Sequence, residues 1–434
     1  MLRLAWYGDD FTGASDTLAT LSAAGLRAAL FPQVPTVDQL DRMGPLDALG
    51  VAGTARALAP AAMREELAGV RALFTRLRPT VTHYKCCSTF DSAPHVGNLA
   101  VGLQALRFDG QHRWVPIVGG QPSLGRFCAF GQLYATASAG GEVFRIDHHP
   151  TMSHHPVTPM GEADLRVHLA AQGLTRTGAI DLRALDSACD EVLDQALDAQ
   201  LAKAPDAVLF DATHETHLER IGRLLWQRAA QHPLLALGAS SVAQALIACW
   251  PRDAAAHPPP ASIVAPASTP VFLMVGSLSP VTAAQVQASA GDYTAVTIPT
   301  SPSDLGSTAI DSLAAHCVAL LNQGHSVMAR TAAPRPDSAA PADVAAFCGR
   351  LLQGVLQGAP QVRRVGVAGG DTSSFALRHL APWALRWAGS LAPGVPLLRV
   401  HADQPGLDGV ELMLKGGQMG PPDVFGRLLR GTGH

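Results

Sequence analysis

The sequence predicts an α/β protein made of two α/β domains. Three observations carry this prediction: the length of 434 residues, the alternation of short apolar runs with longer amphipathic ones, and a proline-rich break just after residue 250. Single hydrophobic cores stop growing at about 250–300 residues, so a chain of this length favours two domains. Apolar runs that alternate with helix-like runs are typical of layered α/β domains.

The first domain is expected to cover residues 1–250. Its expected strands are Leu2–Tyr7, Ala48–Ala52, Val81–Tyr84, Trp114–Val118 and Ala207–Phe210. Helical periodicity is found at Ala14–Ala24, Ala61–Leu77 and His95–Leu106. Polar residues gather directly after several of these strands. Open α/β sheets bind ligands at the carboxyl ends of their strands, so we expect a ligand site there.

Residues 251–269 are the expected linker. This stretch is rich in Pro, Ala and Ser, and its three consecutive prolines cannot lie inside a helix or a central strand. A second α/β domain is then expected over residues 270–434. Its expected strands are Val271–Val275, Ser326–Ala329, Val365–Val367, Leu397–Val400 and Glu411–Leu414.

Composition excludes several classes of protein. With 47% hydrophobic and 15% charged residues the chain is globular, and a net charge of −3 provides no basic field for nucleic acid. Seven cysteines without CxxC spacing argue against a disulfide framework and a structural zinc site. No apolar run reaches the length of a membrane span, and none resembles a secretion signal. We expect a cytoplasmic protein that binds neither nucleic acid nor membranes.

The stretch YGDDFTGASD, residues 7–16, places two adjacent carboxylates where the first strand meets the first helix. Asp9 and Asp10 could simply cap that helix. Alternatively, Gly8 and Gly13 would let the backbone approach a small polar ligand, while a carboxylate accepts hydrogen bonds or a proton from its hydroxyls. Both interpretations stay open on this motif alone.

The loop KCCSTFDS, residues 85–92, follows another expected strand. Lys85 could supply a point charge, and the hydroxyls and carboxylate that follow could hold a ligand's hydroxyls. The alternative is a solvated Ser/Thr-rich turn. Cys86 and Cys87 fit packing better than nucleophilic chemistry, because no partner pattern of a cysteine hydrolase is visible. Arg56, also just past a strand, could pair with a ligand carboxylate.

A histidine-rich stretch, DHHPTMSHHP, covers residues 147–156. Its spacing matches neither a helical H-x-x-x-H nor a zinc finger, and its prolines hold the chain extended. A loop that lines the substrate or a domain interface is favoured over a metal site.

Three glycine turns follow strands of the second domain: GSLSP at 276–280, AGGDTSS at 368–374 and KGGQMG at 415–420. Pro280 is expected in the first turn of a helix, and Asp371 or Thr372 is expected to cap another. Helix N-termini of this kind bind phosphate well. Because the chain lacks the P-loop and Rossmann patterns, the three turns suggest a nucleotide site of another type.

Together these motifs resemble the four-carbon acid sugar kinases. The landmarks lie in the expected order along nearly the whole chain: GDDFTGASD, KCCSTFDS, HHPVTPM, FDATHETHLERIG, GSLSPVTAAQ, AGGDTSS and KGGQMG. The resemblance implies an N-terminal acid-sugar-binding domain, a C-terminal nucleotide-binding domain, and phosphorylation of tetronate-type acids by ATP.

The loop KCCSTFDSAP is similar to that of the 3-oxo-tetronate kinase branch, which implies conversion of 3-oxo-tetronate to 3-oxo-tetronate 4-phosphate. A loop of IDSTLRGN character, found in D-threonate and D-erythronate kinases, is absent, although those acids remain alternatives. The segment 122–156 is longer and differently decorated than this branch leads us to expect. A kinase for 3-oxo-isoapionate therefore stays open as well.

Apart from Arg56, whose surrounding TAR is less distinctive, each site residue implied by the resemblance lies in one of these landmarks. Substrate contacts fall on Asp9, Arg56, Lys85, Cys86, Cys87, Ser88 and Thr89. ATP contacts fall on Ser277 or Ser279, on Gly369, Gly370, Asp371 and Thr372, and on Gly417. We expect Asp10 or Asp91 to accept the proton of the attacking hydroxyl. Phosphate and water would carry most of the Mg²⁺ coordination, with Asp371 as the candidate protein ligand.

The expected partners are a small-molecule sugar acid and ATP, and a homodimer stays open. Two rival functions remain. The acid-rich first domain and the histidine-rich stretch could serve a metal-dependent sugar-acid dehydratase or aldolase. A protein that closes on a small acid without chemistry is the other rival.

Overall fold

A computed structural model describes residues 2–108, 114–137, 140–155, 157–250, 263–333 and 335–433. The chain forms two compact α/β units, which confirms the expected fold class. Unit 1 comprises Met1–Ala28 and Thr36–His257, and unit 2 comprises Ala29–Pro35 and Pro258–His434. Much of the proposed linker, residues 251–262, lies outside the described residues.

The sheet of unit 1 is parallel and has the strand order β3-β1-β4-β11-β5-β10-β9. Its strands are β1 (Leu4–Gly8), β3 (Ala48–Ala52), β4 (Val81–Lys85), β5 (Val115–Val118), β9 (Thr177–Ile180), β10 (Ala207–Phe210) and β11 (Leu234–Gly238). Six of these strands are buried along their whole length, as expected for a parallel sheet that helices cover on both faces.

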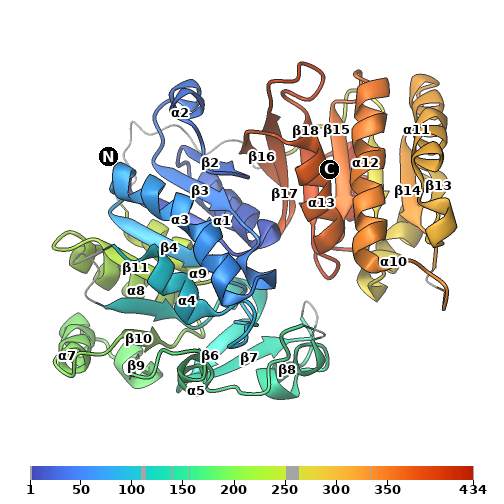
Figure 1. Cartoon of the computed structure of the whole chain (residues 1–434). Helices are drawn as coiled ribbons and strands as arrows, with labels where there is room; N and C mark the ends of the chain where they lie inside the picture. Colours follow the sequence, from blue (N-terminus) through green and yellow to red (C-terminus); the bar gives the residue numbers. More distant parts are fainter. Residues whose placement is uncertain are drawn as a thin grey trace. The chain divides into compact units, whose positions relative to one another are not determined.

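Helices of unit 1 connect the strands and pack over the sheet. They are α1 (Phe11–Ala23), α2 (Val37–Met43), α3 (Pro60–Leu77), α4 (Leu99–Leu106), α5 (Leu165–Ala170), α6 (Leu182–Leu185), α7 (Asp190–Leu201), α8 (Glu215–Ala229) and α9 (Ser241–Cys249). Helix α9 packs against α8 and α1, whereas α3 packs against α4 (Figure 1).

A small antiparallel sheet, β6-β7-β8, is inserted after β5. Its strands are β6 (Arg126–Ala129), β7 (Gln132–Thr136) and β8 (Val143–Arg145). The turn between β6 and β7 is held by Asp211, whose carboxylate accepts the backbone N–H groups of Phe130 and Gly131 at 2.5 and 2.9 Å. Asp211 follows β10, so it fixes the insertion to the carboxyl end of the main sheet.

Unit 2 has the strand order β13-β14-β12-β15-β18-β17-β16. The strands are β12 (Phe272–Val275), β13 (Thr294–Ile298), β14 (Val327–Thr331), β15 (Arg364–Ala368), β16 (Ala384–Ala392), β17 (Val395–His401) and β18 (Glu411–Lys415). The helices are α10 (Pro280–Ala288), α11 (Ser307–Asn322), α12 (Pro341–Gly358), α13 (Gly370–Leu380) and α14 (Val424–Arg430). Helices α11, α12 and α13 run side by side, and α10 packs against α14 (Figure 1).

A short segment from early in the chain completes unit 2. Strand β2 (Ala28–Phe31) pairs antiparallel with β16 through Leu30 and Leu385. The chain therefore passes between the two units three times, at residues 28–29, 35–36 and 257–258.

The expected strands are present, and the differences at helix ends have local causes. Helix α1 begins at Phe11 rather than Ala14 because the Asp10 side chain caps it. Helix α4 begins at Leu99, since Asn98 accepts the Val101 N–H at 2.9 Å. The expected cap of α13 by Asp371 or Thr372 is wrong.

Helix α13 starts at Gly370, and its N-cap Gly369 has a φ of 128° that favours glycine. The prediction failed because the glycine backbone makes the turn before α13 without a side-chain cap.

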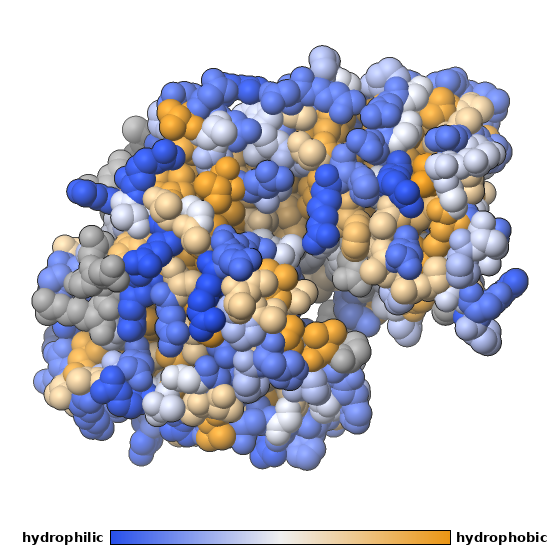
Figure 2. All heavy atoms as spheres, viewed as in Figure 1, coloured by the Kyte–Doolittle hydropathy of each residue, from blue (hydrophilic) through white to orange (hydrophobic). Residues whose placement is uncertain are grey.

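On the face shown in Figure 2, hydrophilic and hydrophobic residues are interspersed, as on most protein surfaces.

Candidate active site

The carboxyl ends of the unit 1 strands line up in one row. Gly8 on β1 is the register partner of Ala52 on β3 and of Lys85 on β4, and Lys85 is the partner of Gly238 on β11. Residues that follow these positions therefore emerge at the same edge of the sheet. Several residues expected to bind the substrate are brought together here: Asp9, Asp10, Arg56, Lys85, Cys86 and Cys87.

Arg56 holds the two adjacent carboxylates. Its Nη2 lies 3.0 Å from Asp9 Oδ1, and its Nη1 lies 2.6 Å from Asp10 Oδ2. The backbone N–H of Arg56 also donates to the Asp9 carbonyl at 3.1 Å. Arg56 was expected to pair with a ligand carboxylate, but its guanidinium already pairs with the carboxylates of Asp9 and Asp10.

Lys85 lies against the first turn of α1. It is 4% exposed, and its Nζ donates to the Cys86 carbonyl at 2.7 Å. A Cβ added at Gly13 would lie 2.1 Å from Nζ, so only glycine leaves room for the ammonium group. Because the Gly13 N–H donates to Asp10 Oδ1 at 2.5 Å, Asp10 and Lys85 both border this glycine.

The two aspartates titrate differently. Burial raises the pKa of Asp9 to about 6, with the Asp10 charge adding to the effect and Arg56 opposing it. Burial also acts to raise the pKa of Asp10, but Arg56, Lys85 and the Gly13 N–H together bring it below its ordinary value. Near neutral pH, Asp10 is therefore the fixed anion of the pair, while Asp9 is the group that can exchange a proton.

The loop after β4 is tightly packed. Thr89 Oγ1 donates to Asp91 Oδ1 at 2.5 Å, and Asp91 is 5% exposed. Burial raises the pKa of Cys86 and of Cys87, which agrees with the expectation that these thiols pack rather than attack. Ser88 is half-buried in the same loop.

Support for this loop comes from α5, which sequence reasoning missed. His168 Nε2 lies 2.9 Å from Ser92 Oγ, and Gln172 Nε2 donates to the same hydroxyl at 2.8 Å. Ser92 in turn donates to the Phe90 carbonyl at 2.8 Å. Phe90 has a φ of 54°, a conformation that is rare for an aromatic residue and that these bonds hold in place.

Two histidines of residues 147–155 stabilise the turns that follow them by accepting backbone N–H groups. His149 Nδ1 accepts the N–H groups of Thr151 and Met152 at 3.1 and 3.2 Å, and His155 Nδ1 accepts that of Thr158 at 3.1 Å. Within the described parts of the chain, no group of three His, Cys, Asp or Glu side chains is arranged to hold a metal ion.

The three glycine turns of unit 2 lie next to one another. Val275 is the register partner of Ala368, and Ala368 is the partner of Lys415, so the turns follow three neighbouring strands. The N–H groups of Gly276 and Ser277 donate to the Ala368 carbonyl at 2.9 and 3.1 Å. The three motifs therefore lie at the same edge of the unit 2 sheet.

Hydroxyl groups connect two of these turns. Ser279 caps α10 by accepting the Thr282 N–H at 3.1 Å, and Pro280 occupies the expected first-turn position. Ser279 Oγ and Thr282 Oγ1 both contact the Gly417 carbonyl. The resulting edge presents the N-termini of α10 and α13, where backbone N–H groups suit an anion.

At the N-terminus of α13, Thr372 is 5% exposed, and its Oγ1 would lie 2.1 Å from a Cβ added at Gly276. Gly369 and Gly370 form the turn before it. The side chain of Asp371, the candidate Mg²⁺ ligand, lies outside the described part of the structure.

Lys415 is a buried cation that sequence reasoning missed. It is 0% exposed, and its Nζ donates to the Gly416 carbonyl at 2.9 Å and to Thr282 Oγ1 at 3.2 Å. Burial lowers its pKa to about 8. The motif KGGQMG was interpreted through its glycines. Its lysine ends an apolar strand, and because buried lysines are rare, that position could itself have indicated a functional residue.

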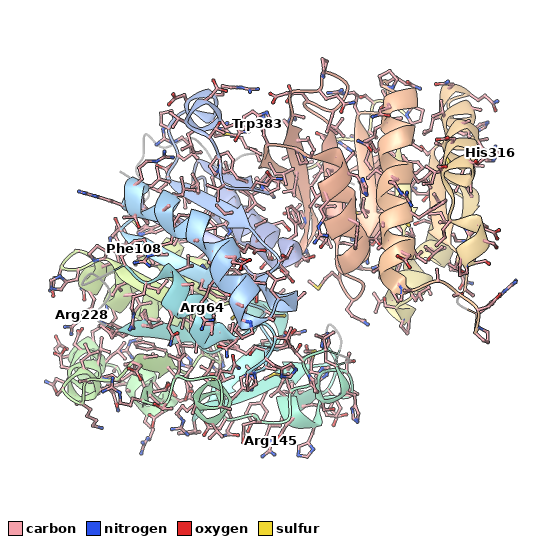
Figure 3. The ribbon with its side chains drawn as sticks, viewed as in Figure 1. Arg64, Phe108, Arg145, Arg228, His316 and Trp383 are labelled. Atoms are coloured by element: carbon pink, nitrogen blue, oxygen red, sulfur yellow. The ribbon has the colours of Figure 1, made fainter. Side chains whose placement is uncertain are left out.

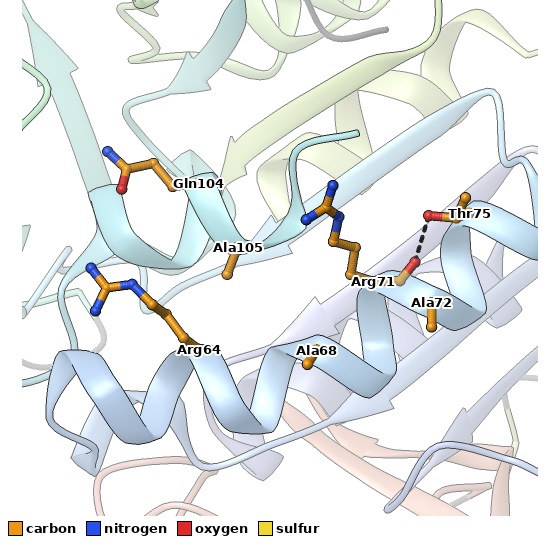
Figure 4. A pocket seen from close by; sticks show the side chains of 7 residues that line it. All are labelled: Arg64, Ala68, Arg71, Ala72, Thr75, Gln104 and Ala105. Carbon is orange, nitrogen blue, oxygen red and sulfur yellow. Dashed lines mark hydrogen bonds between the residues drawn. The ribbon is translucent and has the colours of Figure 1, made fainter. Parts of the chain in front are cut away.

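A separate groove of about 590 Å³ lies between α3 and α4 (Figure 4). It is lined by Arg64, Ala68, Arg71, Ala72, Thr75, Gln104 and Ala105. None of these residues belongs to the sites described above.

Comparison with known proteins assigns each half of the chain to a described domain family. Residues 4–246 match a family described as the sugar-binding N-terminal domain, and residues 272–425 match one described as the nucleotide-binding C-terminal domain. The chain belongs to the four-carbon acid sugar kinase family. It is thus a kinase with one domain for a sugar and one for a nucleotide, as the motifs indicated.

Among relatives of this kinase is the 3-oxo-isoapionate kinase of Paraburkholderia graminis, which is 37% identical over 99% of this chain and 94% of that protein. The 3-oxo-tetronate kinase of Methylobacterium radiotolerans is 30% identical over 99% of both chains. Crystal structures of proteins from Salmonella typhimurium and Haemophilus influenzae share the fold, with TM-scores of 0.80 and 0.74 at 24% and 21% identity. Each alignment covers 98% of both chains.

No helix in the described parts of this kinase is both long enough and apolar enough to cross a membrane.

The Asp9→Asn variant tests the electrostatics of the acid pair. Between about pH 4 and pH 6 the folded kinase keeps a proton on Asp9 that the unfolded chain releases, so rising pH lowers the free energy of unfolding. The pKa difference corresponds to about 3 kcal/mol across this window. Urea denaturation from pH 4 to 7 should show this loss in the parent and not in Asp9→Asn. An unchanged slope in that variant, with exposed Asp38→Asn as the control, would contradict the assignment.

The Lys415→Met variant tests the buried cation. Because the folded-state pKa of Lys415 is depressed, its charge destabilises the fold below about pH 8, and this cost disappears as pH rises toward 10.5. Lys415→Met should therefore raise the free energy of unfolding at pH 7 by about 1–3 kcal/mol. Exposed Lys203→Met should leave it unchanged. A less stable Lys415→Met protein in urea denaturation would show that the lysine serves the fold rather than a ligand.

Proposed function

We propose that this kinase transfers the γ-phosphoryl group of ATP to the terminal hydroxyl of a 3-oxo sugar acid. One observation carries the proposal: a cluster of Asp9, Asp10 and Lys85 in the sugar-binding domain occurs in the same chain as three neighbouring glycine turns in the nucleotide-binding domain. The side chains of the cluster can bind the hydroxyls and the carboxylate of a sugar acid, and the backbone N–H groups of the glycine turns can bind phosphate.

Two acids are the leading candidates. 3-Oxo-isoapionate is favoured by the higher identity to the Paraburkholderia graminis enzyme and by the extended segment 122–156. 3-Oxo-tetronate is favoured by the KCCSTFDS loop, and enzymes acting on it are also relatives across the full chain. D-Threonate and D-erythronate are less favoured, because the loop typical of their kinases is missing.

The donor set of the second unit fits a nucleotide. Free backbone N–H groups at two helix N-termini and the charge of Lys415 complement phosphate oxygens. Ser277, Ser279 and Thr372 would position those oxygens. Mg²⁺, when bound, would neutralise phosphate charge, and oxygen ligands from phosphate and water suit it, with Asp371 as the candidate from the protein.

In the first unit, Lys85 and the loop that follows would orient the acid. Phosphoryl transfer needs positioning and charge stabilisation more than covalent help, so these contacts would supply most of the rate enhancement. Both carboxylate oxygens of Asp10 already accept from Gly13 and Arg56. Asp91 uses Oδ1 to accept from Thr89, which leaves Oδ2 for a substrate hydroxyl. Of the two candidate bases we therefore favour Asp91, with Asp10 as a fixed orienting anion.

A coupled ADP-release assay tests the activity. We expect ADP with 3-oxo-isoapionate or 3-oxo-tetronate, at a kcat/KM at least about tenfold above that for D-erythronate and D-threonate. The control is Gly369→Val, which forces a side chain into a left-handed backbone position beside Ser277 and should abolish ADP release with every acid. Consumption of acid without ADP would favour the dehydratase or aldolase alternative. Acid binding without turnover would favour a binding protein.

Substitution of the two aspartates tests the base. Removing a general base typically lowers kcat by about 100- to 10,000-fold, so Asp91→Asn should do so while the KM for ATP stays within a few-fold. Asp10→Asn should mainly raise the KM for the acid. Asp38→Asn serves as the control, since the Asp38 side chain is 78% exposed and pairs with Arg42 on α2. If Asp91→Asn and Asp10→Asn both keep kcat within a few-fold of the parent, neither residue is the base.

A further inference from the structure

Arg126 is a half-buried cation without a carboxylate partner among the described residues. It begins β6, and its Nη1 donates to the Leu124 carbonyl at 2.5 Å and to Thr136 Oγ1 at 3.3 Å. Its Nε is buried and has no hydrogen-bond partner. Arg56 Nε is buried and unpaired as well, but Arg56 has two carboxylate partners, so the missing counter-charge is what sets Arg126 apart. Buried charges are normally paired, which favours an anionic ligand at Arg126.

The described groups around Arg126 supply no negative charge. Burial lowers the pKa of its guanidinium, and among the described residues the only titratable group that opposes this effect is Cys87. Burial in turn keeps the Cys87 thiol protonated, so it supplies no negative charge at neutral pH. Because Cys87 belongs to the loop after β4, Arg126 lies close to the same loop that carries the expected substrate contacts.

The backbone fixes Arg126 at the carboxyl edge of the sheet. Arg126 and Gln121 exchange two backbone hydrogen bonds, at 2.9 and 3.2 Å, just after β5. The Gln121 side chain is 2% exposed and reaches Asp16 of α1 at 3.4 Å. The insertion therefore ties back to the helix that Asp10 caps.

The other cations of this site are already engaged. Arg56 is neutralised by Asp9 and Asp10, and Lys85 donates to the Cys86 carbonyl beside Asp10. We infer that Arg126, rather than Arg56, binds the carboxylate of the sugar acid. This assignment rests on the proposed function and deepens it. A planar guanidinium suits bidentate pairing with a carboxylate, which an ammonium group cannot reproduce.

With the carboxylate bound at Arg126, the inserted sheet β6-β7-β8 would contribute to specificity for the sugar acid. The acid end of the substrate would be held by β6, while the polyol or keto end would face Lys85 and the loop of residues 85–92. A bulkier or branched acid would then be selected by the length and shape of the inserted sheet rather than by the Asp9–Asp10 pair.

The test compares Arg126→Gln and Arg126→Lys with the parent enzyme. Substrates are the preferred 3-oxo acid and the same compound with its carboxylate replaced by a primary carboxamide. Loss of a charge-assisted hydrogen bond should raise the KM for the acid by about 10- to 100-fold in Arg126→Gln, with the KM for ATP within twofold. Arg126→Lys should recover only part of this loss. The preference for acid over carboxamide should nearly vanish in Arg126→Gln, which a merely structural role would not cause.

Arg145→Gln is the matched control. Arg145 ends β8 of the same small sheet, is exposed, and pairs with Asp147 at the surface (Figure 3). Arg145→Gln should keep the KM for the acid and the KM for ATP at the values of the parent enzyme. Calorimetric titration of each protein with the acid alone measures binding independently of turnover.

The outcomes separate the two proposals. An unchanged KM and unchanged acid affinity in Arg126→Gln would overturn the role of Arg126 while leaving the kinase activity in place. A parent that binds the acid through Arg126 but releases no ADP would overturn the proposed function and keep the carboxylate site. A parent that binds no sugar acid would overturn the carboxylate site as well.

Discussion

The ion pairs of Arg56 with Asp9 and Asp10 are the interaction on which the sugar-binding site depends. Two adjacent carboxylates at the end of a buried strand repel each other, and Asp9 is 2% exposed. One guanidinium that contacts both makes their proximity tolerable and joins the turn after β1 to the segment after β3. Breaking such a buried pair typically costs about 3–5 kcal/mol, because an uncompensated charge remains. Asp10, held by this pair, in turn accepts the Gly13 N–H at the start of α1.

The two units use charge in opposite ways. Among the described residues, unit 1 gives Arg56 two carboxylate partners and leaves Arg126, at the start of the inserted sheet, without one. In the described part of unit 2, Lys415 is buried without a carboxylate partner and donates to one hydroxyl and one carbonyl. In both units the residual positive charge lies at the carboxyl ends of the strands, where helix N-termini add to it. Anionic ligands are the natural complement of both edges.

The fold could be predicted well from the sequence because its signals are local. Apolar runs gave the central strands, and the motifs after them marked the correct edge of each sheet, as the register of Gly8 with Lys85 and of Val275 with Ala368 shows. The pairing of Arg56 with both aspartates was not predictable, since it depends on strands adjacent in the sheet and not in the chain. Arg126 was not predictable for a similar reason, because its lack of a carboxylate partner becomes visible only when its neighbours are known. Lys415, in contrast, could have been predicted as a lysine that ends an apolar strand.

Strand β2 gives this kinase an unusual connectivity. Residues 29–35 are built into unit 2 through the pairing of Leu30 with Leu385, although both neighbours in the chain belong to unit 1. A cut in the proline-rich stretch would therefore not yield two independent halves: the C-terminal fragment would leave the outer edge of β16 unpaired, and exposed strand edges invite association with other chains. Unit 2 is built from two separate segments of the chain, so recombination between relatives would have to exchange both segments together.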